Sequence, residues 1–441
     1  MVRFSIIVKW LTPGIGVKRW LILIMAGIFL IAVAITYAIL KSSMGRVFED
    51  AVLTLDWPLV TVALVSGVVA IGVAIIKLSR NILAPYRKHQ QGTVIDVVYA
   101  HSKRYRGQNV VAIGGGTGLP SVLRGLKSMT SNITAIVTVA DDGGSSGKLR
   151  REMGVLPPGD LRNNIAALAD DESLMTRLFQ YRFQSGDLEG HSFGNLLIAA
   201  LAAVVEEDHQ GSSIAEALVE TERVLNIQGR VLPATLEDVK LVASVRLKDT
   251  GSIIKVQGES QITSMRGQIE DISLMPPNVA AYSESVHAIQ EADLVVIGPG
   301  SLYTSLLPNL MVSGIADALR ATDAYKIYVC NVATQPGETG GYTVAEHVMA
   351  LEQYIGRGVF QVVLANNHYP ALAANSRTRY VEPAPANHEI LQRYEVRYTD
   401  LVDRNRPWRH DPHKLADALL RVSNEERSGS RSPELILTEQ V

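Results

Sequence analysis

The chain has 441 residues, of which 47% are hydrophobic and 20% are charged, and its formal net charge at pH 7 is −2. This balance excludes a nucleic-acid binder that works through bulk electrostatics. A single cysteine excludes an internal disulfide, and with it a disulfide-stapled secreted fold. The content of 35 glycines and 18 prolines is ordinary for a globular protein, so the chain is neither collagen-like nor wholly disordered.

Two long apolar segments lie near the start of the chain, at residues 20–40 and 57–76. Neither contains a charged residue, and each is long enough to cross a hydrocarbon layer of about 30 Å as a helix. A cleaved signal peptide has a shorter apolar core and no second span. Because both segments are apolar on every face, we expect a membrane hairpin within residues 1–80 rather than two buried helices of a soluble protein.

The charged residues around these segments indicate an orientation. Basic residues precede the first segment and follow the second, whereas the connecting loop mixes both signs. Since basic residues stay on the cytoplasmic side, we expect both termini and the main domain to face the cytoplasm. The flanking basic residues are Arg3, Lys9, Lys18, Arg19, Lys77, Arg80, Arg87 and Lys88.

From Asn109 onward, strand-like and helix-like stretches alternate. This alternation is typical of a parallel sheet covered by helices, so we expect a Rossmann-like, doubly wound, mostly parallel α/β domain. The expected strands are 110–113, 133–139, 294–297, 326–329 and 359–364. The expected helices are 119–129, 160–169, 174–183, 192–205, 214–224, 283–291 and 343–354.

Three stretches depart from this alternation. Residues 236–272 predict a small antiparallel β insertion within the α/β domain, which spans 108–424. Residues 81–107 are polar and basic and predict a juxtamembrane linker. Residues 425–441 predict a polar tail.

A glycine-rich turn follows the first expected strand. Backbone N–H groups of such a turn, backed by the next helix, form a cradle for phosphate, and glycine allows a close approach. The turn differs from the dinucleotide fingerprint because Leu119 stands where the third glycine belongs, and it lacks the Gly-Lys-Ser/Thr of a P-loop. We therefore predict a nucleotide or phosphate site rather than an empty turn. Its residues are Gly114, Gly115, Gly116, Thr117 and Gly118.

Two carboxylates, Asp141 and Asp142, end the second expected strand. In a doubly wound sheet, an acid at this place accepts hydrogen bonds from ribose hydroxyls. Paired carboxylates are also suited to hold Mg²⁺ on a diphosphate. Residues 143–147 are expected to form a flexible polar loop, with three basic residues just beyond it.

Two further segments place polar residues at helix starts. Asp160 is placed to cap the helix that begins there. Arg162 and Asn163 lie in its first turn, where they either contact phosphate or are simple surface residues. Gly194 and Asn195 follow a histidine at the start of a very apolar helix, which is suited either to ligand contact or to packing.

Two later strands are also followed by polar loops. Gly298, Gly300 and Ser301 predict a second short anion cradle, and the ring of Tyr303 offers a stacking surface for a base or sugar. Thr334 lies in a loop of polar side chains suited to sugar hydroxyls. These loops follow expected strands, which is where open α/β sheets bind ligands.

Six motifs in fixed order carry a resemblance to a known family. GGGTGL, VTVADDGGSSGKLR, PPGDLRN, GHSFGN, GPGSLYTSLLPN and TQPGET resemble the YvcK-type gluconeogenesis factors. That family belongs to the superfamily of 2-phospho-L-lactate transferase. The resemblance covers roughly residues 108–400 and leaves out the apolar hairpin.

The resemblance implies a Rossmann-like fold that binds a UDP-sugar, such as UDP-N-acetylglucosamine, and links carbon flux to cell-wall precursors and cell shape. It implies that the glycine loop, Asp141 and Asp142 form the nucleotide site, that residues 298–303 contact phosphate and sugar, and that Gly194 and Asn195 line the pocket. The alternative that the superfamily implies is a phospholactyl-type transferase with a nucleoside-diphosphate-linked donor, in which both aspartates would hold Mg²⁺.

A non-catalytic binding role is favoured, and no catalytic residue is assigned. The expected ligand is a nucleotide sugar, and Mg²⁺ belongs to the transferase alternative, in which Asp141 and Asp142 would hold it. The expected partners are a regulated enzyme of amino-sugar or cell-wall synthesis and the bacterial inner membrane, contacted through residues 1–80. A homo-oligomer remains open.

Overall fold

The computed structural model describes residues 17–44, 57–83, 107–169, 174–208, 213–265, 267–371 and 379–428. The chain divides into two units, Met1–His101 and Ser102–Val441. Most of the expected linker, most of the expected tail and several flanking basic residues lie outside the described residues. The last helix continues to Ser428, so residues 425–428 are helical rather than part of a tail.

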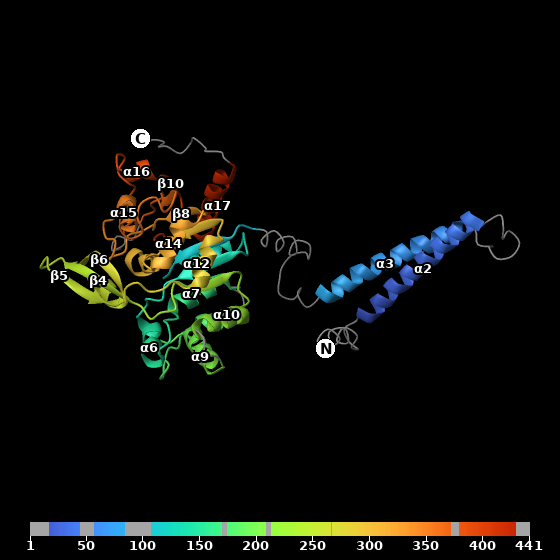
Figure 1. The fold of residues 1–441 in the computed structure, drawn as a ribbon, viewed down its shortest axis with the longest axis horizontal. Coiled ribbons are helices and arrows are strands. Elements are labelled where there is room, and N and C mark those ends of the chain that lie inside the picture. Colours follow the sequence, from blue (N-terminus) through green and yellow to red (C-terminus); the bar gives the residue numbers. More distant parts are fainter. Residues whose placement is uncertain are drawn as a thin grey trace. The chain divides into compact units, whose positions relative to one another are not determined.

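The first unit contains two long helices, α2 (Val17–Met44) and α3 (Trp57–Leu83), which lie side by side (Figure 1). Within them, Arg19–Ile39 and Trp57–Lys77 are long and apolar enough to cross a membrane. Their large side chains point outward, with Ile22 68% exposed and Phe29 67% exposed. The two expected apolar helices are therefore present, and they meet each other mainly through small residues.

The second unit is built on a seven-stranded sheet in which every pairing is parallel. The strand order is β10-β9-β8-β7-β1-β2-β3. Strands β1, β2, β7 and β9 are buried along their whole length and consist mostly of Val, Ile, Leu and Ala, as is typical of parallel strands covered on both faces. The strands are β1 (Val110–Gly114), β2 (Ile133–Val137), β3 (Arg230–Pro233), β7 (Leu294–Ile297), β8 (Tyr325–Val329), β9 (Val362–Asn366) and β10 (Glu395–Thr399).

Helices connect these strands and pack around the sheet. α5 packs against α7 and α17, while α14 packs against α12 and α13. The helices are α5 (Leu119–Leu126), α6 (Gly144–Met153), α7 (Gly159–Leu168), α8 (Leu174–Gln180), α9 (Phe193–Asp208), α10 (Ser213–Leu225), α11 (Glu259–Ser264), α12 (Ser283–Gln290), α13 (Leu307–Leu310), α14 (Ser313–Ala321), α15 (Val344–Ile355), α16 (Ile390–Arg393) and α17 (Pro412–Ser428). A single π-helical turn, Leu302–Leu306, precedes α13.

The expected β insertion is a three-stranded antiparallel sheet in the order β5-β4-β6, which projects from the second unit (Figure 1). Its strands are β4 (Lys240–Leu247), β5 (Ile253–Gln257) and β6 (Gly267–Met275). The short helix α11 separates the last two strands and carries residues back toward the main sheet.

Three expectations about local structure were wrong. The expected flexible loop at residues 143–147 is largely the first turn of α6, because Ser145 and Ser146 are buried against α9. The edge strands β3 and β10 were missed, and both are short and partly polar. The expected strand 359–364 begins later, at Val362.

Candidate functional site

The candidate site lies where the strand order reverses. From β1 the chain continues through β2 and β3 on one side, and β7 returns to pair with β1 on the other. The loops that follow β1 and β7 therefore leave the same edge of the sheet as neighbours. Open α/β sheets bind ligands in the crevice at this reversal.

These two loops touch each other closely. A Cβ atom on Gly118 would lie 2.5 Å from the carbonyl oxygen of Pro299 and 2.8 Å from the Cα atom of Gly300. The side-chain amide of Asn331, which follows β8, donates to the Gly300 oxygen at 2.7 Å and accepts from the Gly300 nitrogen at 3.1 Å. Three strand-following loops are thus fixed together, and Gly118 serves this contact.

The carboxylate of Asp160 forms a hydrogen bond with the backbone of the glycine loop. Gly116 has a positive φ of 61°, and its N–H donates to Oδ2 of Asp160 at 2.8 Å. Burial raises the pKa of the Asp160 carboxyl to about 6, against the lowering effect of the Gly116 N–H. The interpretation of Asp160 as a cap of its own helix was wrong, since α7 has no side-chain cap and this carboxylate faces the glycine loop instead.

The carboxylates after β2 have separate surroundings. Oδ1 of Asp141 accepts from the Gly143 N–H at 2.8 Å, and burial raises the pKa of Asp141. Oδ1 of Asp142 accepts from both the N–H and the hydroxyl of Ser260, each at 2.9 Å. Ser260 belongs to α11, so Asp142 ties the main sheet to the β insertion.

Two glutamates extend this acidic region: Glu259, which is half-buried, and Glu338, which is buried. Sequence reasoning placed Glu338 in a polar loop suited to sugar hydroxyls and did not assign Glu259 to the site. Burial and the charges of Asp141 and Asp160 raise the pKa of Glu259 to about 9. Burial raises the pKa of Glu338 to about 7, although its carboxylate accepts from the N–H of Tyr303 at 3.2 Å. No local pattern marks Glu259, because it reaches the site only through the fold of the β insertion.

Magnesium binding was expected at Asp141 and Asp142 in the transferase interpretation. Among the described residues, no group of three or more His, Cys, Asp or Glu side chains is arranged to hold a metal ion. One or two carboxylates together with a bound diphosphate are enough for Mg²⁺ in many proteins. Asp141 and Asp142 are therefore suited to hold Mg²⁺ only when the phosphate oxygens of a bound ligand supply further coordination.

Gly194 and Asn195 lie near other site residues. The side-chain amide of Asn195 donates to the hydroxyl of Ser145 at 3.1 Å, and Nδ1 of His191 lies 3.1 Å from the same oxygen. A Cβ atom on Gly194 would lie 2.9 Å from Cγ of Arg162. These residues pack α6, α7 and α9 together and support the arginine side chain.

Tyr303 does not offer the open stacking face that was expected. The residue lies in the π-helical turn and is only 5% exposed. Its hydroxyl is 2.8 Å from that of Tyr342, and the two rings meet edge to face. Thr334 is also occupied, since its N–H and its hydroxyl both donate to the carbonyl oxygen of Arg379. Ser301 is half-buried at the start of the turn.

Two cavities open beside these loops. One, of about 290 Å³, brings together four of the predicted residues with three arginines that sequence reasoning missed. The other, of about 550 Å³, lies between α6 and the β insertion, and Asp142 is the one predicted site residue in its lining. The first cavity is lined by Gly116, Thr117, Pro120, Arg124, Arg162, Asn163, Ala166, Gln180, Arg182 and Arg409.

The fold and this crevice define a Rossmann-like, doubly wound α/β protein whose strand-following loops meet where the strand order reverses. The chain belongs to the family described as 2-phospho-L-lactate transferase CofD, whose model matches residues 110–415.

Relatives support this assignment and indicate a branch of the family. A relative from Nostoc sp. is 44% identical over an alignment of 434 residues, and the match covers 94% of this chain and 92% of that protein. A relative from Bacillus subtilis named gluconeogenesis factor is 43% identical over an alignment of 322 residues, and the match covers 72% of this chain and 98% of that protein. The crystal structure of a UPF0052 family member from Bacillus halodurans matches with a TM-score of 0.65 and 40% identity, covering 71% of this chain and 100% of that one.

Proposed function

We propose that this protein is a membrane-anchored regulator that binds a nucleotide sugar such as UDP-N-acetylglucosamine and links carbon metabolism to cell-wall precursor synthesis and cell shape. The observation that carries the proposal is the meeting of the β1 and β7 loops at the reversal of strand order, beside a cavity lined by Gly116, Thr117, Arg162 and Asn163. Backbone N–H groups and guanidinium groups in such a crevice are suited to a diphosphate. The gluconeogenesis factor name of relatives supports the regulatory part.

The binding test is a calorimetric titration of the full-length protein in nanodiscs. We expect UDP-N-acetylglucosamine to bind with a dissociation constant of about 1 μM or tighter, equivalent to about −8 kcal/mol. UDP-glucose, GDP and NAD serve as competitors, with and without Mg²⁺. Equal or tighter binding of GDP or NAD would contradict the proposed ligand.

A matched pair of variants locates the site. Gly116 and Gly186 both have positive φ, but only at Gly116 would a Cβ atom meet a neighbour, Oγ of Ser305 at 2.9 Å. Gly116→Asp should abolish UDP-sugar binding, because it adds bulk and negative charge to the cavity, whereas Gly186→Asp should bind as the wild type does. Equal binding by both variants would remove the glycine loop from the site.

The anchoring part of the proposal rests on the outward-facing apolar side chains of α2 and α3. We place these helices across the bacterial cytoplasmic membrane, with the α/β unit on the cytoplasmic side near an enzyme of amino-sugar or cell-wall synthesis. Deletion of residues 1–83 should move the protein from the carbonate-washed membrane fraction to the soluble fraction. Unchanged fractionation would contradict anchoring.

A second candidate function, phospholactyl-type transfer, is favoured by the description of the matching family model. It predicts Mg²⁺-dependent formation of a phosphodiester product from a nucleoside-diphosphate-linked donor. The measurement is product formation with and without a chelator. Nucleotide-sugar binding that a chelator leaves unchanged, without product after long incubation, would favour the regulator.

A further inference from the structure

The larger cavity, of about 550 Å³, shares no lining residue with the cavity beside the glycine loop. One of its walls comes from α6, and the other comes from the β insertion, through the start of β4, the end of β5 and the turn into α11. Its volume is within the ordinary range of small-molecule sites. The cavity is therefore a candidate for a ligand of its own.

Two glycines bring the walls of this cavity together at Asp142. A Cβ atom on Gly147, in α6, would overlap the backbone oxygen of Asp142, and one on Gly258, before α11, would overlap its Oδ2. Oδ1 of Asp142 accepts from both the N–H and the hydroxyl of Ser260, each at 2.9 Å. The base of the cavity is thus closely packed, and the Asp142 carboxylate there is already hydrogen-bonded within the protein.

The charged side chains that line this cavity differ in their partners. Asp238 forms an ion pair with Arg150, whose side chain is only 8% exposed and whose Nη2 also donates to the Val239 oxygen at 2.6 Å. Within the described part of the chain, Arg151 and Lys240 form no ion pair. Arg151 belongs to α6 and Lys240 begins β4, so each wall carries one cation that no carboxylate neutralises. Such cations attract an anionic ligand.

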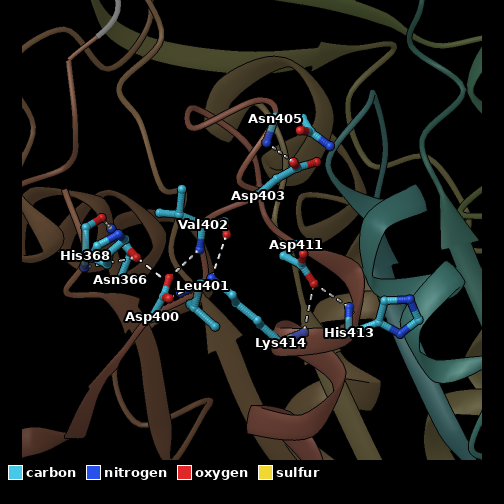
Figure 2. A network of polar contacts seen from close by, with 10 residues as sticks. All are labelled: Asn366, His368, Asp400, Leu401, Val402, Asp403, Asn405, Asp411, His413 and Lys414. Carbon is cyan, nitrogen blue, oxygen red and sulfur yellow. Dashed lines mark hydrogen bonds and ion pairs between the residues drawn. The ribbon is translucent and has the colours of Figure 1, made fainter. Parts of the chain in front are cut away.

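The two cavities depend on different parts of the chain. The smaller one includes Arg409, in the segment before α17, and Figure 2 shows the polar network around this segment. Nζ of Lys414 donates to Oδ2 of Asp400 at 2.6 Å and to the Val402 oxygen at 3.0 Å. No residue of this network lines the larger cavity. Substitutions in the larger cavity therefore leave that framework intact.

We propose that the larger cavity binds a small organic phosphate, such as a sugar phosphate, at the same time as the nucleotide sugar occupies its own site. A phosphate monoester carries close to two negative charges at pH 7, which matches the cations of Arg151 and Lys240. The side-chain amides of Gln257 and Gln261 line the same cavity and can both donate and accept hydrogen bonds, as sugar hydroxyls require. A site of this kind gives the protein a second input, whatever ligand the glycine loop binds.

The test is a calorimetric titration of the full-length protein in nanodiscs with glucose-6-phosphate, glycerol phosphate and unphosphorylated glucose, at constant ionic strength. At least one of the two phosphates should bind, and glucose should not. Arg151→Gln and Lys240→Gln should each weaken phosphate binding by about 10-fold, because each removes a charge-assisted hydrogen bond. Lys148→Gln is the matched control, since this exposed lysine belongs to α6 and does not line the cavity. It should bind as the wild type does.

Simultaneous titration distinguishes a second site from an extension of the first. Saturation with UDP-N-acetylglucosamine should leave the affinity for the organic phosphate within about twofold, since sites without shared residues act independently. Mutual displacement of the two ligands would overturn the second site. Failure of both phosphates to bind, or an equal loss in Lys148→Gln, would also overturn it and leave the proposed function standing. Phosphate binding that depends on Arg151 and Lys240, without any binding of UDP-sugars, would support the second site and overturn the proposed nucleotide-sugar ligand.

Discussion

The helical hairpin and the glycine loop both bring two backbones together at glycine, but their surroundings are opposite. In the hairpin, a Cβ atom on Gly27 would lie 2.9 Å from the oxygen of Gly67 and 2.7 Å from Cγ1 of Ile71. In the loop, a Cβ atom on Gly118 would lie 2.5 Å from the oxygen of Pro299. The hairpin contact lies between helices whose large apolar side chains face outward, whereas the loop contact lies above a buried sheet and beside charged cavities.

This comparison shows that the structural role of a glycine can be assigned only when its neighbours in the fold are known. Gly27 permits helices to approach, as small residues do in membrane helix pairs. Gly118 permits close contact between the loops that follow β1 and β7. Gly116 adopts a positive φ, and its N–H donates a hydrogen bond to Asp160. A Cβ atom on Gly114 would have only ordinary neighbours at 3.6 Å. The glycine run therefore has several separate roles, and a phosphate cradle alone does not explain it.

The largest loss of stability and of ligand binding is expected at Gly118, where the loops that follow β1 and β7 are in contact. Gly118→Val should destabilise the α/β unit by about 3 kcal/mol and abolish ligand binding, because the backbone conformation there is ordinary and the clash is purely steric. Urea unfolding and the calorimetric titration are the measurements. Gly340→Val, where nothing lies within 4 Å of the new Cβ, is the control. Similar losses in both variants would contradict the loop contact.

The hairpin should respond next most strongly. Gly27→Leu should weaken packing of α2 against α3 by about 1 to 3 kcal/mol, because the side chain would meet Gly67 and Ile71. Gly72→Leu serves as the control, since a Cβ atom there meets nothing within 4 Å. The measurement is an SDS titration of the reconstituted protein followed by fluorescence of Trp20 and Trp57. If SDS unfolds the two variants equally easily, close contact of α2 with α3 at Gly27 would be contradicted.

The acid beneath the glycine loop gives a pH-dependent prediction. The pKa of Asp160 in the folded protein is about 6, above the ordinary 3.8, so the folded state binds this proton more tightly than the unfolded chain does. Stability from Asp160 is therefore greatest below about pH 4 and falls as pH rises to about 6. Asp160→Asn removes that cost while keeping an acceptor for the Gly116 N–H.

The variant should accordingly be more stable than the wild type at pH 7.5, by about 1 to 3 kcal/mol, and the difference should disappear near pH 4. Urea unfolding of both proteins across this pH range measures it. A variant that is less stable at pH 7.5 would show instead that the negative charge is needed to hold the loop.

The smallest effect is expected at the first glycine of the run. Gly114→Ala should change the free energy of unfolding by less than about 1 kcal/mol and leave UDP-sugar affinity within twofold, since its neighbours are at contact distance. Gly118→Ala, measured in the same titration, should lose much more affinity than Gly114→Ala. A large loss of stability or affinity in Gly114→Ala would contradict the separate roles of the two glycines.

Much of the fold follows from local patterns in the chain. The expected strand at 294–297 has the bounds of β7, and the expected strand at 110–113 lies within β1, because fully buried parallel strands are short continuous apolar runs. The antiparallel character of the insertion was also predictable, although it reaches to Met275. Helix α6 was missed because its Gly-Gly-Ser-Ser start has low helix propensity and is held by burial against α9.

The candidate site was only partly predictable. Gly116, Thr117, Arg162 and Asn163 were predicted because they follow strands or begin helices, and in the structure they line one cavity at the edge of the parallel sheet where such positions converge. The covered ring of Tyr303 and the carboxylate of Asp160 turned toward Gly116 were not predictable, since each depends on a neighbour from another loop.

Local sequence determines the two apolar helices, the strand–helix alternation and the glycine loops. The first two follow from the spacing of apolar residues and the last from runs of glycine, and each depends on a short stretch of chain. The pairing of Asp142 with Ser260, 118 residues away, and the approach of Arg409 to the glycine loop depend on the folded sheet. Contacts between residues so distant in sequence leave no local trace, because the chain specifies them only through packing of whole elements.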